Sequence, residues 1–274
     1  MFNSKLLSVV FLLAVWAPLP AQIMRTLMQR PDYALESKWE VDSEGAHCLV
    51  YENKDNCDYY AYRVNDNSYE LRPGKNTIFR RAKNENFDNQ FRQASSYYFY
   101  RGIFPNKFNI QFPYAFPVKK DSKVMLAMDR RERVKTLRFR MEVGDTVYAT
   151  RSGMACSVYD PRILLVYHQD HTFAAYLTMR TCFVVPGESV QVGQPVGIAN
   201  EKGVSISFFF LDENKFASST ASGYPYTHFI PTFRTTQGDL KPSPKTVYQT
   251  LVDDDLITKE MSKREKKKYM KRKK

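Results

Sequence analysis

Histidine, glycine and closely spaced cysteines are scarce in this chain of 274 residues, and each scarcity narrows the chemistry it can support. There are 11 glycines and no G-x-x-x-x-G-K-[ST] or G-x-G-x-x-G run, which excludes the usual nucleotide-phosphate loops. The four cysteines contain no C-x₂-C spacing, which disfavours a cysteine zinc site. The only histidines are His47, His168, His171 and His228, so a metal or acid–base site has few imidazoles to draw on.

Long apolar runs are also missing, apart from one near the N-terminus. Residues Leu6–Trp16 form this run, preceded by Lys5 and followed by prolines and Ala21. Eleven residues are too few to span a bilayer, which takes roughly 20 as a helix. We interpret residues 1–21 as a secretory signal cleaved after Ala21. The mature protein is therefore expected to be exported, to the periplasm or cell envelope.

Export permits disulfide bonds. Cys48 and Cys57 flank a turn-like segment, while Cys156 and Cys182 lie on two apolar, strand-like stretches. The economical pairing is Cys48 with Cys57 and Cys156 with Cys182. Four cysteines nevertheless allow three connectivities, and the sequence does not choose among them.

The positive charge of the chain is concentrated at its C-terminal end. Residues 259–274 hold ten Lys and Arg against two Glu, which supplies +8 of the formal net charge of +12. We expect this exposed basic tail to add little to folding stability. It is either a solvated segment that aids solubility or an attachment to an anionic envelope surface, and we expect no nucleic-acid partner. The second interpretation depends on Lys266, Lys267, Lys268, Lys271 and Arg272.

Short runs of β-branched and aromatic residues, separated by Asn, Asp, Gly and Pro, dominate from residue 38 onward and predict an all-β fold. Residues 33–118 are expected to form a small N-terminal β-sandwich-like domain. Residues 119–235 are expected to form a second antiparallel domain, followed by a linker at 236–258 and the tail. Two glycine–acid pairs, Gly144-Asp145 and Gly187-Glu188, predict tight turns in which the acidic side chain caps the turn.

Three motifs resemble those of lysostaphin-like (LytM-type) zinc endopeptidases. Residues 144–153 (GDTVYATRSG) resemble the family's G-T-x-V-x-A-x-x-x-G segment. Residues 184–197 (VVPGESVQVGQPVG) resemble its V-x-x-G-[DE]-x-V-x-x-G-Q-x-[IV]-G strand pair, and residues 112–118 (FPYAFPV) resemble a lead-in found in members with an extra N-terminal β domain. The resemblance implies a β core of the duplicated hybrid motif type and a groove that binds peptides of bacterial cell walls.

The chain departs from the family at its metal-binding and catalytic positions. The resemblance implies two His and one Asp as zinc ligands, with further His assisting the attacking water. Here Ser205 and Ser207 occupy the H-x-H positions, Thr178 occupies a third His position, and Arg138 replaces the Asp. Neutral hydroxyls are weak zinc ligands and a guanidinium is not one. We therefore expect no zinc, no other cofactor and no catalytic residues.

The remaining candidates do not rebuild a site. His168-Gln169-Asp170-His171 is interpreted as a polar hairpin turn, and Asp129, Glu132 and His228 could approach the groove without any spacing that argues for it. The favoured interpretation is an exported, catalytically inactive homologue that binds peptidoglycan peptide or docks onto and regulates a wall-processing hydrolase. Two alternatives are an active zinc endopeptidase with substitute ligands and a purely structural envelope protein.

Overall fold

The computed structural model of the chain describes residues 27–28, 31–63, 67–83, 97–128, 135–218 and 224–273. Within these residues, strands in several antiparallel sheets make up most of the structure and helices are few. The predicted all-β fold class is confirmed. None of the helices in this part of the chain is long and apolar enough to cross a membrane. The expected signal at 1–21 lies outside the described residues.

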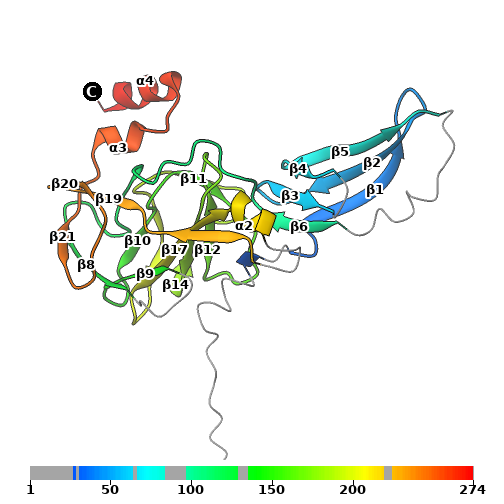
Figure 1. The fold of residues 1–274 in the computed structure, drawn as a ribbon. Helices are drawn as coiled ribbons and strands as arrows, with labels where there is room; N and C mark the ends of the chain where they lie inside the picture. The colour runs from blue at the N-terminus through cyan, green and yellow to red at the C-terminus, as the bar shows by residue number, and fades with distance from the viewer. Residues whose placement is uncertain are drawn as a thin grey trace, which may run out of the picture.

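The N-terminal strands form an arm that projects from the rest of the molecule (Figure 1). Alternation along its strands sets the buried side, since Tyr59 and Ala61 are buried while Tyr60 and Tyr62 are half-buried. One sheet has the order β1-β2-β5, and a second has the order β4-β3-β6. The strands are β1 (Leu35–Val41), β2 (His47–Asn53), β3 (Tyr59–Tyr62), β4 (Tyr69–Leu71), β5 (Gly74–Arg81) and β6 (Tyr98–Arg101).

A nine-stranded sheet forms the centre of the rest of the chain, in the order β15-β11-β12-β13-β17-β9-β8-β21, with β18 also paired to β17. Its strands are β8 (Lys123–Met128), β9 (Thr136–Phe139), β11 (Gly153–Ala155), β12 (Leu164–Tyr167), β13 (Phe173–Leu177), β15 (Ser189–Val190), β17 (Val204–Leu211), β18 (Tyr226–Phe229) and β21 (Val247–Gln249). The pairings within this sheet are antiparallel.

Two smaller sheets complete the second part of the chain. The first has the order β10-β16-β14, formed by Thr146–Tyr148, Pro195–Ala199 and Met179–Cys182. The second has the order β20-β19-β7, formed by Gly238–Leu240, Thr232–Thr235 and Pro113–Tyr114. Strands β7 and β19 are parallel although about 120 residues separate them, which brings the lead-in segment against the chain's late strands.

The two predicted glycine–acid turns are present. Gly144 and Gly187 have φ of +93° and +90°, in the left-handed region that favours glycine. The Asp145 carboxylate accepts a hydrogen bond from the backbone N–H of Glu142 at 2.8 Å, and that of Glu188 accepts one from Val185 at 3.2 Å. The acidic side chains therefore cap both turns, as predicted.

The nine-stranded sheet has a different hydrophobic core on each face. Ile206 and Phe208 of β17 and Tyr176 of β13 face a core made mostly within the second part of the chain. The alternate residues, including Phe173, Leu177 and Phe209, face a core shared with the N-terminal residues, among them Leu27, Met28, Leu35 and Tyr59. The N-terminal strands therefore cover part of one face of the central sheet.

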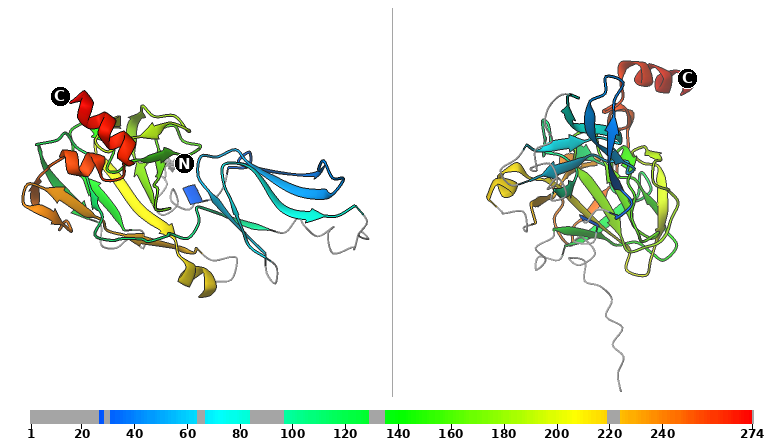
Figure 2. Two further views of the ribbon diagram at one scale, coloured as in Figure 1. Left: turned by 90° about the horizontal axis from the view of Figure 1, so that it is seen from above. Right: turned by 90° about the vertical axis from the view of Figure 1, so that its right-hand side faces the viewer.

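The C-terminal region differs from the expected linker and loose tail. Segment 236–258 contains β20, β21 and helix α3 (Asp254–Thr258), and β21 pairs with β8 at the edge of the central sheet. Leu256 of α3 is buried against Ala115 and Val192. Helix α4 (Lys263–Arg272) then stands out from the molecule (Figures 1 and 2). Expecting a linker was wrong, because short strands and one helical turn give little signal until their partners are known.

Candidate functional site

The four positions where the family resemblance places metal ligands and catalytic histidines lie together. Arg138 of β9 is the register partner of Ser205 of β17, and Ser205 is also the partner of Leu177 at the end of β13. Thr178 follows Leu177 directly, and Ser207 lies two residues beyond Ser205 on the same face. The sheet therefore places Arg138, Ser205 and Ser207 on one face of β9 and β17, with Thr178 close by where β13 ends.

These side chains do not fit a zinc ion. Arg138 is exposed and Thr178 is half-buried, whereas Ser205 and Ser207 are only 6% and 0% exposed. Neutral hydroxyls bind Zn²⁺ weakly, and the guanidinium of Arg138 carries a fixed positive charge that opposes a cation. Thr178 also has φ of +62°, a strained conformation for a β-branched residue. The position offers a hydrogen-bonding surface with one positive charge.

His228 lies against this surface, which the sequence did not predict from any spacing. Its Nδ1 is 3.0 Å from the hydroxyl oxygen of Ser207, and its Nε2 is 2.9 Å from the hydroxyl oxygen of Tyr224. Burial, with the nearby charges of Lys215 and Lys135, lowers the pKa of His228 to about 4, so its imidazole is neutral at neutral pH. The other two residues named as candidates, Asp129 and Glu132, lie outside the described residues.

The surroundings of the Ser207–His228 pair indicate a structural role. Ser207 is fully buried, His228 is 7% exposed, and the second imidazole nitrogen contacts a phenol rather than a carboxylate. A nucleophilic serine must reach its substrate and have its histidine oriented by a third group. This pair instead fixes β17 to β18.

The segment His168–His171 forms the polar hairpin turn that the sequence predicted. The backbone N–H of His168 donates to the carbonyl of Thr172 at 2.9 Å, and that of His171 donates to the carbonyl of His168 at 3.0 Å. Nδ1 of His168 is 2.7 Å from the carbonyl oxygen of Ser152, so this nitrogen carries the proton. Burial and the charge of Arg151 lower the pKa of His168 to about 3.

A buried arginine cluster next to this turn was missed by sequence reasoning. The side chain of Arg151 is 5% exposed, and its guanidinium contacts Asp170 at 2.9 Å and Glu260 at 2.6 Å. It also donates to the hydroxyl of Tyr114 at 2.8 Å and lies 4.0 Å over the ring of Phe112. Burial acts to raise the pKa of Asp170, but the charge of Arg151 holds it below its usual value. Arg151 thus joins the lead-in segment, the hairpin turn and the C-terminal region.

A shallow pocket of about 380 Å³ opens beside the arginine cluster. Ser152, Tyr167, His168, His171, Asp58 and Glu260 are among its lining residues. Arg138, Thr178, Ser205 and Ser207 are not. The pocket and the family-site positions are therefore separate surfaces.

The cysteines are free thiols in the structure, and neither expected bond is formed. Cys182 donates to the carbonyl oxygen of Val184 at 3.3 Å. Cys156 lies instead beside Cys57, and with Asp55 these two form the one group of potential metal-binding side chains found among the described residues.

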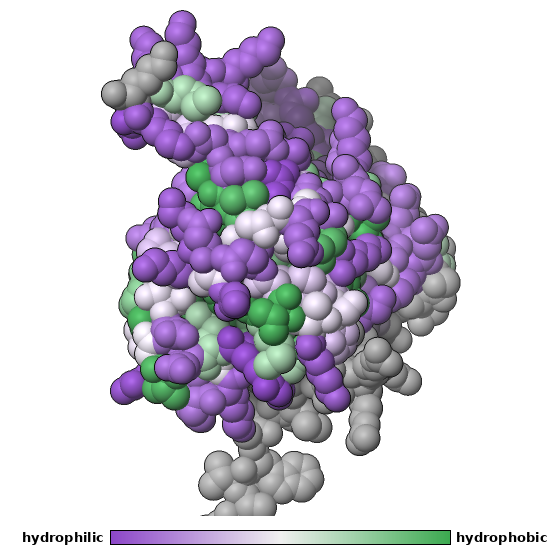
Figure 3. All heavy atoms as spheres, turned by 90° about the vertical axis from the view of Figure 1, so that its left-hand side faces the viewer, coloured by the Kyte–Doolittle hydropathy of each residue, from purple (hydrophilic) through white to green (hydrophobic). Residues whose placement is uncertain are grey.

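The basic residues of the tail are presented on α4. Lys266, Lys267, Lys268, Lys271 and Arg272 are all exposed, and the protruding end of the molecule is hydrophilic (Figure 3). The helix begins with a capping box formed by Ser262 and Glu265. The tail also contacts the fold, because Glu260 pairs with buried Arg151 and the Tyr269 hydroxyl donates to Asp254 of α3 at 2.9 Å.

Comparison with known proteins gives structural similarity at low identity to M23 peptidases, the class of the lysostaphin-like enzymes. No family profile matches the chain, and no curated protein matches its sequence. Pseudoalterin, an M23 metalloprotease from the deep sea, is 16% identical with a TM-score of 0.30, covering 35% of this chain and 69% of its own. A Pseudomonas aeruginosa protein assigned to peptidase M23 is 13% identical with a TM-score of 0.31, covering 65% and 83%. Helicobacter pylori Csd3 is 12% identical with a TM-score of 0.29, covering 82% of this chain and 57% of its own.

Proposed function

We propose that this chain is an exported, catalytically inactive lysostaphin-like homologue that binds the acidic end of a cell-wall peptide at Arg138. The observation that carries the proposal is the chemistry of the family-site positions. Arg138 is an exposed residue and the register partner of Ser205, where the family resemblance expects zinc ligands. A guanidinium matches a carboxylate in charge and in hydrogen-bonding geometry.

The same side chains argue against hydrolysis at this position. Without a Lewis acid, water keeps a pKa near 15.7 instead of about 7, and nothing polarises the peptide carbonyl. Ser207 is fully buried and engaged with His228, so it does not replace the missing nucleophile. What supports peptide binding at these positions is the exposed positive charge of Arg138, which can hold a peptide carboxylate.

A binding titration tests the proposal. The ligand is a wall stem peptide with a free C-terminal carboxylate, compared with the same peptide amidated at that end. Arg138→Ala should weaken binding of the free acid by about tenfold to a hundredfold, the range for one charge-assisted hydrogen bond, and should not change binding of the amide. Arg162→Ala removes the same charge from an exposed residue paired with Asp160 and should leave binding unchanged.

Zinc content and wall digestion separate this proposal from its alternatives. One zinc per chain, with release of wall peptides that a chelator abolishes, would establish an active endopeptidase and overturn the proposal. Absence of peptide binding, with co-purification of a hydrolase, would favour docking onto a wall-processing enzyme. Absence of zinc, peptide and hydrolase alike would leave a structural envelope protein.

A further inference from the structure

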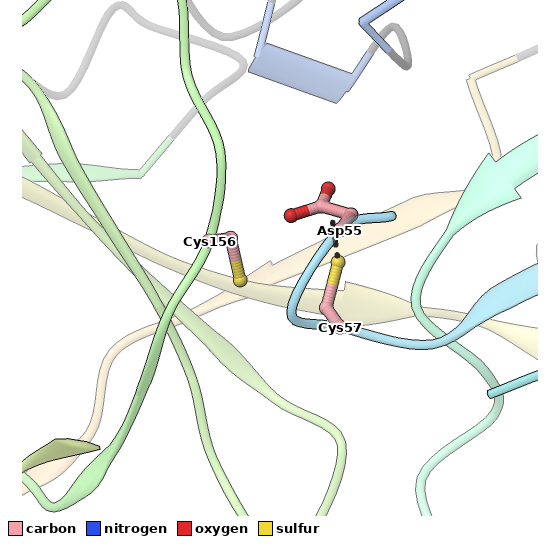
Figure 4. Close-up of side chains that lie close together, drawn as sticks. All are labelled: Asp55, Cys57 and Cys156. Carbon is pink, nitrogen blue, oxygen red and sulfur yellow. Dashed lines mark hydrogen bonds between the residues drawn. The ribbon is translucent and has the colours of Figure 1, made fainter. Parts of the chain in front are cut away.

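Three side chains from distant parts of the sequence meet where the N-terminal strands contact the central sheet. Asp55 and Cys57 lie on the turn between β2 and β3, and Cys156 directly follows β11. One carboxylate oxygen and the two sulfur atoms all lie within 4.8 Å of one another. Figure 4 shows the two thiols directed toward the same space from separate segments.

Buried polar contacts join the turn that carries Cys57 to the segment that carries Cys156. The Asp55 carboxylate accepts a hydrogen bond from the backbone N–H of Ser157 at 2.8 Å, the residue after Cys156. It also pairs with Arg101 at 3.4 Å, both side chains being almost fully buried. Arg101 in turn donates to the carbonyl of Ser157 at 2.9 Å. Two polar contacts of Ser157 therefore hold the preceding residue, Cys156, against the turn that carries Cys57.

We propose that Cys57 and Cys156 form a disulfide bond that ties the N-terminal strands to the central sheet. Both thiols are buried, 0% and 1% exposed, and each is adjacent to the other. Neither is placed to bond Cys48, which lies in β2 near Asp42, or Cys182, which lies in β14. This bond would replace the two expected bonds, Cys48 with Cys57 and Cys156 with Cys182. It is independent of the proposed peptide binding.

The bond forms by thiol–disulfide exchange with a disulfide donor, for which oxidised glutathione serves as the probe. The thiolate of one cysteine attacks a glutathione sulfur, giving a mixed disulfide and releasing one glutathione thiolate. The second cysteine thiolate attacks the protein sulfur of that mixed disulfide and releases the second glutathione. Two protein thiols are oxidised, one glutathione disulfide is reduced to two glutathione molecules, and the two thiol protons go to these.

Oxidation belongs to folding rather than to the folded protein. Burial raises the pKa of the Cys57 thiol well above its ordinary value, and the adjacent Cys156 raises it further. Because exchange requires an accessible thiolate, the folded thiols react slowly. The chain is therefore refolded in the presence of the glutathione pair.

A metal ion fits this cluster less well. Structural zinc takes four ligands, whereas the cluster supplies three. The Asp55 carboxylate is already engaged by Ser157, Tyr59 and Arg101. The guanidinium of Arg101 also adds a positive charge beside the site.

Peptide mapping decides the question because trypsin places each cysteine in a separate peptide. Cleavage after Lys and Arg yields 39–54 with Cys48, 55–63 with Cys57, 152–162 with Cys156 and 181–202 with Cys182. The full chain is refolded with reduced and oxidised glutathione, denatured with an alkylating agent and digested without reductant. We expect peptides 55–63 and 152–162 to be joined, with Cys48 and Cys182 alkylated. Alkylation of both Cys57 and Cys156, any other pairing, or one zinc per refolded chain would overturn the proposal.

Unfolding with and without reductant gives a second readout. The bond closes a loop of about 100 residues, so reduction should raise the unfolding equilibrium constant roughly 30- to 3,000-fold. The variant Cys48→Ala with Cys182→Ala should show the same response as the natural chain. The variant Cys57→Ala with Cys156→Ala should show none, and an equal response in both variants would contradict the assignment.

Discussion

His168 and His228 carry imidazoles that are almost fully buried and held neutral by their surroundings. Burial lowers their pKa to about 3 and about 4, respectively. In the unfolded chain both titrate near the ordinary value of about 6.5. Between these values the unfolded state binds protons that the folded state does not. The folded protein is therefore stabilised above about pH 6.5, and this contribution is lost as pH falls.

We predict that His228→Gln flattens the pH dependence of stability. In the natural chain the free energy of unfolding should fall between about pH 6.5 and 4, by about 1.4 kcal/mol per pH unit for each imidazole that titrates only in the unfolded state. Removing one imidazole should reduce this slope by about 1.4 kcal/mol per pH unit, which corresponds to one proton. The measurement is denaturant unfolding across this pH range. Carboxylates such as Asp170 contribute equally to both proteins, so the difference in slope isolates His228.

Gln237→Asn is the control for substitution as such, because Gln237 is exposed and carries no titratable group. The slope of this variant should equal that of the natural chain. An unchanged slope in His228→Gln would contradict the buried, neutral state of this imidazole.

The sequence identified His228 but not its contact with Ser207, and the reason is physical. The two residues are 21 positions apart and meet only because β18 pairs with β17. The family motifs carried the strand positions of Arg138, Thr178 and Ser205, and the pairing of β9 and β13 with β17 brings these positions near one another. Arg151 was missed because an arginine next to a small residue gives no local sign that it will be buried.

At the scale of elements, local chemistry was more predictable than pairing. The Gly144-Asp145 and Gly187-Glu188 turns follow from two adjacent residues, and both formed as expected. Strand β21 pairs three residues with β8, and β7 pairs two residues with β19. In both cases the partners are more than 100 positions apart in the sequence. Such segments are too short to show an alternating hydrophobic pattern, so their structure depends on the strand with which they pair.

The ion pair between Glu260 and Arg151 is one of the contacts that hold the C-terminal region, together with the burial of Leu256. We predict that Glu260→Gln loosens the segment between α3 and α4. The carboxylate contacts Arg151 at 2.6 Å with only 17% of its side chain exposed. Losing its charge should cost roughly 2 kcal/mol and should speed proteolysis between α3 and α4, because Asp170 is then the remaining acidic partner of Arg151 among the described residues. Limited trypsin digestion with thermal unfolding measures both effects.

Glu265→Gln provides the control within the same segment. Glu265 is exposed and caps α4 without contacting the core. This variant should leave the midpoint of thermal unfolding nearly unchanged. Equal effects of both substitutions would show that the Arg151 contact does not hold the region in place.

At the scale of the whole molecule, the shared core couples the N-terminal arm to the sheet face that carries Ser205 and Ser207. Gly102 packs so closely on Phe173 that an added Cβ would lie 2.6 Å from its ring. The hydroxyl of Tyr226 donates to the carbonyl of Arg101 at 3.0 Å. Ser207 is fully buried on this face, while Arg138 on the neighbouring strand β9 is exposed. Among these positions Arg138 is therefore the side chain that a ligand from solvent reaches first.

Unlike the N-terminal arm, the basic tail extends away from both hydrophobic cores. We predict that it binds anionic membranes independently of the fold. Residues 262–274 hold nine Lys and Arg against one Glu. Each basic residue near an anionic surface contributes about 1 kcal/mol. A truncation should end at Met261, since removing Glu260 would also break the Arg151 pair. This truncation should reduce binding to phosphatidylglycerol-containing vesicles at low salt by at least about tenfold, with little change in thermal stability.

Charge reversal at Lys266, Lys267 and Lys268 distinguishes attraction by charge from a role of the helix itself. These side chains are exposed, and the contacts of Tyr269 and Lys273 with Asp254 do not involve them. The triple Glu variant should therefore keep α4 in place and lose vesicle binding. Pure phosphatidylcholine vesicles should bind none of the proteins, and added salt should abolish binding of the natural chain because it screens the charges. Vesicle binding that survives both the truncation and the charge reversal would show that the attachment lies elsewhere on the molecule.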